Sequence, residues 1–362
     1  MTAPEAVVLV GGQGTRLRPL TLSTPKQLLP VAGVPLIAHL LARLRVAGVE
    51  HVVLATSYRA ELFAAALGDG SAFGLELEHV TEAKPLGTGG GVRGVVDRLR
   101  AGPDEPVLVL NGDVLSATDP AALVEAHRAA AADVTLELVR VPDPRAFGLV
   151  PTEPSGRVTA FLEKPERAED IVTDQVNAGC YVFRRRVLDR IPAGRPVSVE
   201  RETFPELLRS GARLHGVVTG AYWRDLGTPA DYVRGSCDVV LGAAPSPALP
   251  GEPGERLVLA GAQVSPGAEV VGGSVVGAGA VVEAGAVVDG CVLLDGAVVE
   301  RGASVTGSAV GVGARVGAGT VCADVVLGDG AWVGPDNELR GGLRLWPGAR
   351  VEAGTVRFSG LG

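Results

Sequence analysis

The chain has 362 residues, which is enough for two domains that each bury a substantial core. Its formal net charge of -8 argues against nucleic acid or an anionic membrane surface as the main partner, so anionic ligands must be held by local cations. Apolar residues make up 46% of the chain and aromatic residues only 4%, which predicts cores built mainly from Val, Leu and Ala.

The cysteines and the N-terminal region bear on the compartment. Cys180, Cys237, Cys291 and Cys322 lie far apart and form no C-x-x-C pair, which indicates buried thiols in a reducing environment. The first apolar run begins within about six residues of the N-terminus, which leaves no room for a signal peptide. No apolar run is long enough to cross a bilayer. We therefore expect a cytoplasmic protein.

The first 242 residues alternate short apolar runs with helical patterns. We expect strands at residues 7–10, 52–55, 107–110 and 134–139, and helices at residues 36–47, 60–67 and 121–131. Such alternation predicts an α/β domain with a Rossmann-like, mostly parallel sheet and helices on both faces. In such sheets ligands bind beyond the carboxyl ends of the strands.

The first expected strand runs directly into a glycine-rich turn. Residues 6–10 are followed by Gly11-Gly-Gln-Gly-Thr-Arg-Leu-Arg-Pro19 and then by Pro25-Lys-Gln-Leu-Leu-Pro30. Glycine lets backbone amides approach and point at phosphate oxygens, and Arg16 and Lys26 add cations where those phosphates would lie. The turn is not a P-loop, and Leu17 stands where the dinucleotide fingerprint requires glycine. We interpret it as a cradle for a nucleoside triphosphate.

Two aspartates are candidate metal ligands. Asn111-Gly-Asp113 follows the strand expected at residues 107–110, so the Asp113 carboxylate lies at a carboxyl end, beside the glycine-rich turn. A second carboxylate, Asp225, occurs in Tyr222-Trp-Arg-Asp-Leu-Gly-Thr-Pro229. Mg²⁺ prefers such oxygen ligands. Asx-Gly-Asp is also a common turn, and the residues alone leave that alternative open.

Three further strings are candidate ligand-binding segments. Glu163-Lys-Pro165 ends a strand-like run at residues 158–162, and Asn177-Ala-Gly179 comes just before a strand expected at residues 181–183. Pro85-Leu-Gly-Thr-Gly-Gly-Gly91 is a second glycine cluster, preceded by Glu82. A carboxylate such as Glu82 can accept the adjacent N1–H and N2–H of guanine, whereas uracil and thymine offer one imino N–H. A solvent-exposed glutamate at a strand end is an equally open alternative.

Beyond residue 256 an aliphatic residue recurs at every sixth position. Val276, Val282, Val288 and Leu294 show this spacing, the phase then slips, and the pattern returns at residues 299–305, 310–316 and 327–333. Inward aliphatic residues at this period, with glycine and small residues between them, predict a parallel β-helix. Residues 243–256 contain four prolines and no apolar periodicity, which indicates a linker. The expected division is therefore 1–242, 243–256 and 257–362.

Together these strings resemble the sugar-nucleotide pyrophosphorylases, which are nucleotidyltransferases acting on sugar 1-phosphates. The pattern G-G-x-G-T-R-L-x-P-L-T-x-x-x-P-K-x-L-x-P covers residues 11–30, and W-x-D-x-G-T-P covers residues 223–229. The hexad region resembles the left-handed β-helix that many of these enzymes carry.

The resemblance implies a role for each candidate residue. The implied catalytic residues are Arg16 for pyrophosphate, Lys26 for the α-phosphate region, Lys164 for the sugar phosphate, and Asp113 and Asp225 for Mg²⁺. The implied nucleotide-binding residues are Leu9, Gly11, Gly12, Gly14, Thr15, Glu82, Gly87 and Thr88. The implied sugar-phosphate-binding residues are Gly112, Glu163, Lys164, Asn177 and Gly179.

One string points to a subgroup. Ser198-Val-Glu-Arg-Glu-Thr-Phe-Pro205 resembles a string common in mannose-1-phosphate guanylyltransferases, which implies Mg²⁺-dependent transfer from GTP to mannose 1-phosphate, giving GDP-mannose and pyrophosphate. The sequence departs from the family at Gln27, where Pro or Met is frequent, and in Pro-Leu-Gly-Thr-Gly at residues 85–89, where Ala usually comes last.

Several alternatives stay open. One is a glucose-1-phosphate thymidylyl- or uridylyltransferase, and another is a non-catalytic regulatory or scaffold subunit of the same fold. An acetyltransferase is disfavoured because no histidine follows His215 to act as a general base. Since hexad coils often pack between subunits, we expect a homo-oligomer without nucleic-acid or membrane partners.

Overall fold

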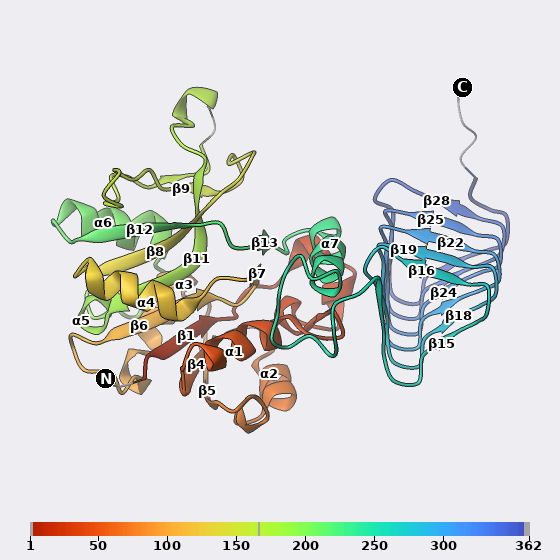
Figure 1. The fold of residues 1–362 in the computed structure, drawn as a ribbon, viewed down its shortest axis with the longest axis horizontal. Coiled ribbons are helices and arrows are strands. Elements are labelled where there is room, and N and C mark those ends of the chain that lie inside the picture. The colour runs from red at the N-terminus through yellow and green to blue at the C-terminus, as the bar shows by residue number, and fades with distance from the viewer. Residues whose placement is uncertain (1–2, 166, 358–362) are drawn as a thin grey trace. The chain divides into compact units, whose positions relative to one another are not determined.

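The computed structural model describes residues 3–165 and 167–357, and its contacts divide the chain into two compact units (Figure 1). The first unit comprises Met1–Gly12 and Leu40–Trp223, and the second comprises Gln13–His39 and Arg224–Gly362. The glycine-rich turn therefore divides between them: Gly11 and Gly12 belong to the first unit, and residues 13–39 belong with the C-terminal part of the chain. Helix α1 (Leu36–Val46) crosses the boundary.

The first unit is built on a nine-stranded sheet. Its main order is β10 (Leu162–Glu163), β9 (Gly148–Leu149), β11 (Gln175–Arg184), β6 (Pro106–Asn111), β1 (Glu5–Leu9), β4 (His51–Thr56) and β5 (Glu76–Thr81). Strand β8 (Val134–Arg140) pairs with β11 and with β12 (Leu214–Thr219). The run β6-β1-β4-β5 is parallel, and β11 pairs antiparallel to β6. This parallel core confirms the expected Rossmann-like fold.

The three inner parallel strands β1, β4 and β6 are rich in Val, Leu and Ala and largely buried, as is typical of strands covered on both faces. Val7 pairs in register with Val53 and Val109, and all three have no exposed surface. Their face packs against α3 (Gly87–Gly94) and the turn that follows it. The other helices of this unit are α2 (Ala60–Leu67), α4 (Pro120–Ala129), α5 (Arg185–Leu188) and α6 (Phe204–Arg209). Helix α4 packs on β6 and β8, in front of the sheet in Figure 1.

Two details of the sequence-based expectations are wrong. The run at residues 158–162 is not a continuous strand, because only Leu162–Glu163 pairs in register with β9, and Val158 forms an isolated bridge. The Asn177-Ala-Gly179 segment lies inside β11 and not before it. The register between β11 and β8 shifts between Asn177 and Tyr181, so the segment is a bulge in the strand.

The second unit contains three parallel sheets, the arrangement of a left-handed β-helix (Figure 1). Sheet E consists of β14 (Arg256–Val258), β17 (Ser274–Val276), β20 (Val292–Leu293), β23 (Ala309–Val310), β26 (Val326–Leu327) and β29 (Arg344–Leu345). Sheet F consists of β15 (Gln263–Val264), β18 (Val281–Val282), β21 (Val298–Val299), β24 (Arg315–Val316), β27 (Trp332–Val333) and β30 (Arg350–Val351). Sheet G consists of β16 (Glu269–Val271), β19 (Val287–Asp289), β22 (Ser304–Thr306), β25 (Val321–Ala323) and β28 (Glu338–Leu339).

The hexad pattern forms the core of the β-helix. Val282, Val299, Val316 and Val333 stack in register from coil to coil, each without exposed surface. The expectation at one position is wrong by one residue. Leu293 pairs with Val276 and is fully buried, whereas Leu294 lies beyond the end of β20, so the phase slip falls before residue 294.

Helix α7 (Pro229–Val240) packs against both the β-helix and residues 13–39 of the second unit. It packs against β17 and β20 and against β2 (Pro30–Val31), which pairs with β3 (Val34–Pro35). The Tyr232 hydroxyl donates to the Pro30 carbonyl at 2.6 Å, and the Ala32 amide donates to Ser236 Oγ at 2.8 Å. The residues after the glycine-rich turn are therefore fixed on a helix that itself rests on the β-helix.

Among the residues that the structure describes, no helix has both the length and the apolar character needed to cross a membrane.

Candidate active site

The glycine-rich turn starts at the carboxyl end of β1. Gly11 and Gly12 follow Leu9 and are exposed. The adjacent strand β6 ends at Asn111, and the Gly112 amide donates to the Leu9 carbonyl at 2.9 Å. This hydrogen bond places the backbone that carries Asp113 beside the start of the turn. The structure therefore brings Leu9, Gly112 and the Asp113 backbone together within the first unit.

In the second unit the turn folds tightly around Gly14. Gly14 has φ +59°, in the left-handed region, and its carbonyl accepts from Thr21 Oγ1 at 2.8 Å. A Cβ at this position would also lie 3.0 Å from Lys26 Cβ, so glycine is required both by conformation and by space. Thr15–Leu17 then form one 3-10 turn, in which Thr15 and Arg16 are exposed and Leu17 is buried.

Arg16, Lys26 and Asp225 converge in the second unit. Lys26 is only 5% exposed, and its Nζ lies 3.2 Å from Asp225 Oδ1. Arg16 Nη2 lies 3.8 Å from Asp225 Oδ2. A buried ammonium is costly unless it is paired, and the carboxylate provides that pairing. The result is a carboxylate that faces two cations, one buried and one exposed, next to a glycine turn.

The sugar-phosphate candidates lie in the first unit, where β11 passes the end of β6. Gly179 has φ +81°, and a Cβ there would lie 2.8 Å from Asn111 Nδ2, so glycine lets the bulge approach Asn111. The Gly179 amide donates to Asn177 Oδ1 at 3.0 Å, and Asn177 Nδ2 donates to the Tyr181 hydroxyl at 2.7 Å. Burial raises the pKa of Tyr181, so this hydroxyl stays neutral. The side chain of Asn177 is thus held in a fixed orientation.

Glu163 and Lys164 follow at the short strand β10. Lys164 has φ +49° and a side chain that is 58% exposed, with Nζ 3.9 Å from Glu163 Oε1. The Lys164 amide donates to the Phe147 carbonyl at 3.1 Å, which fixes the backbone, while the ammonium is exposed. An exposed ammonium on a fixed backbone can follow an anionic ligand.

The second glycine cluster begins helix α3. There Thr88 contacts the string at residues 198–205, which in the sequence only indicates a subgroup. Thr88 Oγ1 donates to Glu200 Oε2 at 3.0 Å and accepts from the Val199 amide at 2.9 Å. Ser198 Oγ also donates to Glu200 Oε2 at 2.8 Å. Glu200 was therefore missed as a partner of the candidate nucleotide segment. The Ser198-Val-Glu string was the available signal, but the sequence alone did not show what it contacts.

Glu82 is half-buried at the carboxyl end of β5, and not the exposed glutamate that the sequence left possible. Burial raises the pKa of its carboxyl group. The Leu86 amide donates to Oε2 at 3.4 Å, and Oε1 is buried without a hydrogen-bond partner among the described residues. Gly91 lies between Glu82 and Leu9, because a Cβ on it would be 3.3 Å from Glu82 Oε1 and 3.3 Å from Leu9 Cδ2. Glu82 and Leu9 thus flank the same glycine of α3.

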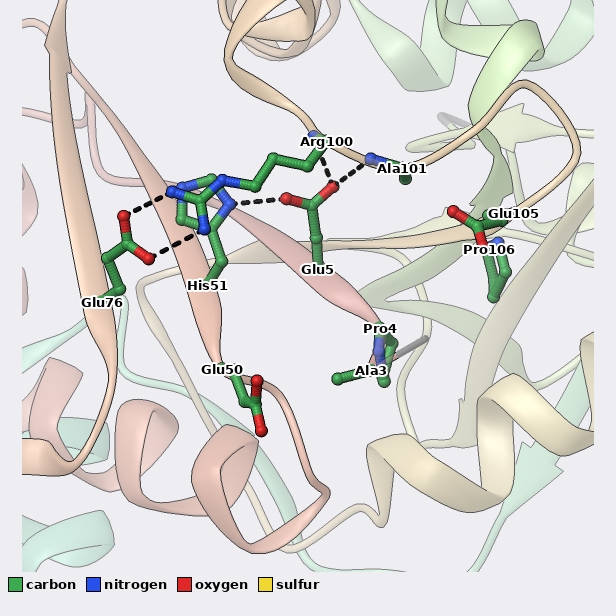
Figure 2. A pocket seen from close by; sticks show the side chains of 10 residues that line it. All are labelled: Ala3, Pro4, Glu5, Glu50, His51, Glu76, Arg100, Ala101, Glu105 and Pro106. Carbon is green, nitrogen blue, oxygen red and sulfur yellow. Dashed lines mark hydrogen bonds and ion pairs between the residues drawn. The ribbon is translucent and has the colours of Figure 1, made fainter. Parts of the chain in front are cut away.

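A pocket at the amino ends of β1, β4 and β5 contains none of these candidates (Figure 2). Glu5 lies at its centre, accepting from the Arg100 and Ala101 amides at 2.8 and 2.6 Å, with His51 Nδ1 2.6 Å from its other oxygen. Arg100 also pairs with Glu76. Because these strands are parallel, this pocket lies at the opposite edge of the sheet from the glycine-rich turn.

The candidate metal ligands are too few for a site made of protein alone. In residues 3–165 and 167–357 no group of three or more His, Cys, Asp or Glu side chains could hold a metal ion. Asp113 and Asp225 belong to different units. Each carboxylate by itself has the oxygen ligands that Mg²⁺ prefers, and this ion is usually held by one or two carboxylates together with phosphates.

The fold and these residues define a class of enzyme. The model of the nucleotidyl transferase family matches residues 5–240, and the model of the GMPPB C-terminal domain matches residues 253–351. The chain belongs to the nucleotidyl transferase family and is a nucleotidyltransferase.

Individual relatives narrow the comparison. The chain is 57% identical to the mannose-1-phosphate guanylyltransferase of Mycobacterium tuberculosis over 356 residues, 98% of each chain. It is 40% identical to mannose-1-phosphate guanylyltransferase 1 of Arabidopsis thaliana over 236 residues, 64% of this chain and 63% of that one. Among solved structures, it is similar to HddC from Yersinia pseudotuberculosis complexed with GMP-PN, with a TM-score of 0.55 and 25% identity, covering 64% of this chain and 98% of that one.

Proposed function

We propose that this chain transfers a guanylyl group from GTP to mannose 1-phosphate, giving GDP-mannose and pyrophosphate, in the cytoplasm. The convergence of Arg16 and Lys26 on Asp225 carries the proposal, because a non-catalytic scaffold has no need of a buried ammonium beside a glycine turn. The 57% identity to the mycobacterial guanylyltransferase supports the choice of base and sugar.

The proposed reaction needs no protein nucleophile. An oxygen of the sugar 1-phosphate attacks the α-phosphorus of the nucleotide, the bond to the β-phosphate oxygen breaks, and pyrophosphate leaves with that electron pair. Such transfers depend on positioning and on neutralising negative charge around phosphorus. Lys26 is the fixed cation for the α-phosphate region, Arg16 the exposed cation for the departing pyrophosphate, and Lys164 the cation for the attacking phosphate.

Substrate selection is assigned to the first unit. The Glu82 carboxylate, whose Oε1 has no hydrogen-bond partner among the described residues, would accept from the N1–H and N2–H of guanine. Those two donors would favour the ionised carboxylate and so oppose the effect of burial on its pKa. Asn177 and Glu163 would contact the sugar hydroxyls, with Gly179 keeping the backbone clear.

Asp113 and Asp225 would hold Mg²⁺, since their oxygens are the ligands that this ion prefers. When bound, Mg²⁺ supplies positive charge that offsets the charge of the phosphates. Asp225 already pairs with Lys26 through one oxygen and with Arg16 through the other, so these two cations fix its orientation.

Two wider expectations remain proposals. We propose residues 1–242 as the catalytic domain, residues 243–256 as the linker and residues 257–362 as the β-helix domain. We also propose that the protein is a homo-oligomer, which light scattering of the purified chain would test.

Pyrophosphate release tests the function directly. Each of GTP, ATP, UTP and dTTP is combined with mannose 1-phosphate or glucose 1-phosphate, with and without a chelator. We expect the GTP and mannose 1-phosphate pair to exceed every other pair by at least about tenfold in kcat/KM, in keeping with a site that pairs with polar groups of the base. Chelation should abolish the activity and excess Mg²⁺ restore it. Preference for UTP or dTTP would favour the alternative enzymes, and no release with any pair would favour the scaffold subunit.

A further inference from the structure

Arg344, in the last strand of sheet E, binds the backbone of the glycine-rich turn. Its Nη1 donates to the carbonyl of Arg16 at 2.7 Å and to the carbonyl of Arg18 at 2.8 Å. These residues lie more than 300 positions apart in the sequence, and all belong to the second unit. A side chain of the β-helix thus binds the carbonyl groups of the two residues on either side of Leu17.

A second contact lies a few residues further along the same segment. Ser23 Oγ donates to Asp329 Oδ2 at 2.8 Å. The other oxygen of Asp329 accepts from the Val312 amide at 3.0 Å, so this carboxylate is itself fixed on the β-helix. The segment from Arg16 to Ser23 is therefore tied to the β-helix at two points.

The two carbonyls that Arg344 binds are not used by the turn itself. Within the turn, the Leu17 amide donates to Gly14 and the Arg18 amide donates to Thr15. The Arg16 and Arg18 carbonyls follow these acceptors, at the end of the 3-10 turn where helical carbonyls lose their partners. A charged donor shared between them fixes the angle between the two peptide groups.

That angle sets the direction of the Arg16 side chain. Leu17 is fully buried and anchors the turn from below, whereas the Arg16 side chain is 69% exposed and lies 3.8 Å from Asp225. Because packing does not restrain an exposed side chain, its position depends on its backbone. Arg344 supplies that restraint.

We propose that Arg344 is a positioning residue for nucleotidyl transfer, through which the β-helix holds the 15–18 turn so that Arg16 faces Asp225. This inference rests on the proposed function, in which Arg16 binds the leaving pyrophosphate. It gives the β-helix a part in catalysis without placing any of its side chains on the substrate.

The test compares Arg344→Ala with Arg301→Ala, which removes another exposed arginine from a turn of the same β-helix. Hydrogen exchange is measured over residues 14–22, and kcat, KM and Tm are measured in parallel. We expect Arg344→Ala to speed exchange in this segment and to lower kcat, each by at least about tenfold, which is the factor for one of the two charge-assisted hydrogen bonds that are lost. The KM for the sugar 1-phosphate and the Tm should stay at the values of the Arg301→Ala variant.

Arg344→Lys is the rescue variant. A lysine keeps a cationic donor at this position but lacks the planar guanidinium, so we expect exchange and kcat between those of the wild type and Arg344→Ala. If Arg344→Ala lowers the Tm, the comparison is made with Arg344→Met, which keeps most of the length of the side chain and removes its hydrogen-bond donors.

Each outcome decides the proposal. Exchange or kcat equal to that of Arg301→Ala overturns it, because positioning requires both a looser turn and a slower reaction. If the wild type transfers no nucleotide, the proposed function fails. Faster exchange in Arg344→Ala would then still support the structural restraint, and unchanged exchange would overturn that too.

Discussion

At the scale of single residues, the charged side chains around Asp225 raise the question of which are structural and which act in the reaction. Lys26 is the clearest case. It is buried and paired with Asp225, which is a structural role, and it is also the proposed cation for the α-phosphate region. The sequence identified Lys26 and Asp225 as separate motifs. It could not show that Lys26 is buried or that the two pair, since their side chains are brought together by folding across 199 positions.

We predict that Lys26→Met lowers kcat by more than about a hundredfold, on the scale of losing one preorganised electrostatic contact. The variant keeps the apolar stem in its buried site, so the fold should persist. It leaves the negative charge of Asp225 without its Lys26 partner and should lower the free energy of unfolding by roughly 1 to 3 kcal/mol. Steady-state kinetics and urea unfolding measure the two effects.

The double variant Lys26→Met/Asp225→Asn tests the effect of this pairing on stability, and because Asp225 is also a proposed ligand of Mg²⁺, its loss should keep kcat low. Removing the carboxylate charge should restore part of the stability without restoring kcat. Recovery of kcat together with stability would show that Lys26 acts only by neutralising Asp225.

At the scale of elements, the sequence predicted those whose periodicity is local and missed features set by neighbouring strands. The apolar runs correctly marked β1, β4, β6 and β8, and the hexads correctly marked the coils of the β-helix. The bulge at Asn177 is a shift in the register between β11 and β8, which no local pattern reveals. Leu293 is the buried residue in place of Leu294 because the spacing from Val288 to Leu293 is five residues and not six.

Strand β8 contains an unexpected buried carboxyl group, Glu137. It is 1% exposed, Thr118 Oγ1 donates to its Oε1, and Oε2 has no hydrogen-bond partner among the described residues. Burial raises its pKa to about 7, although the Thr118 hydrogen bond and the charge of Arg43 oppose the shift. No local pattern marks this carboxyl group as buried, because Glu137 stands in an otherwise ordinary strand sequence.

We predict that Glu137 makes the protein less stable as pH rises from 4.5 to 7. In this range the folded state binds the proton more tightly than the unfolded state, so the stabilisation is complete below pH 4.5 and is lost as pH passes 7. At about 1.4 kcal/mol per unit, the loss is roughly 3 kcal/mol. Glu137→Gln removes it, and urea unfolding at several pH values measures the difference.

The contribution of the buried His127 to stability has the opposite pH dependence. The wild type must therefore be compared with Glu137→Gln at each pH value. Burial, together with the nearby Arg184 charge, lowers the pKa of His127 to about 4, so its contribution to stability is lost as pH falls from 6.5 to 4. Both proteins contain His127, and the difference between wild type and Glu137→Gln therefore isolates Glu137. A difference that does not change with pH would show that folding does not shift the pKa of Glu137.

At the scale of the whole molecule, the two units do not follow the order of the sequence. Residues 13–39 form one unit with α7 and the β-helix, although a periodicity analysis assigns them to the α/β region. Composition and hexad spacing reveal that a β-helix exists, but not which earlier residues pack on it. The packing depends on Tyr232, Ser236 and Arg344, whose individual sequence contexts carry no such signal.

This arrangement predicts that the core of the β-helix is required for nucleotidyl transfer. Val299 is fully buried, and Val299→Asp would place a charge in the aliphatic ladder at a cost of several kcal/mol. The coils should then open and release the segment that Arg344 and Asp329 hold. We expect a lower Tm, faster hydrogen exchange over residues 14–22 and a fall in kcat of at least about tenfold, on the scale of a displaced substrate-positioning group.

Val258→Asp introduces the same charge at a position that is 41% exposed, in the first strand of sheet E, and should change none of the three. If Val299→Asp disrupts the β-helix by circular dichroism while transfer continues at the wild-type rate, the glycine-rich turn keeps its conformation without support from the coils.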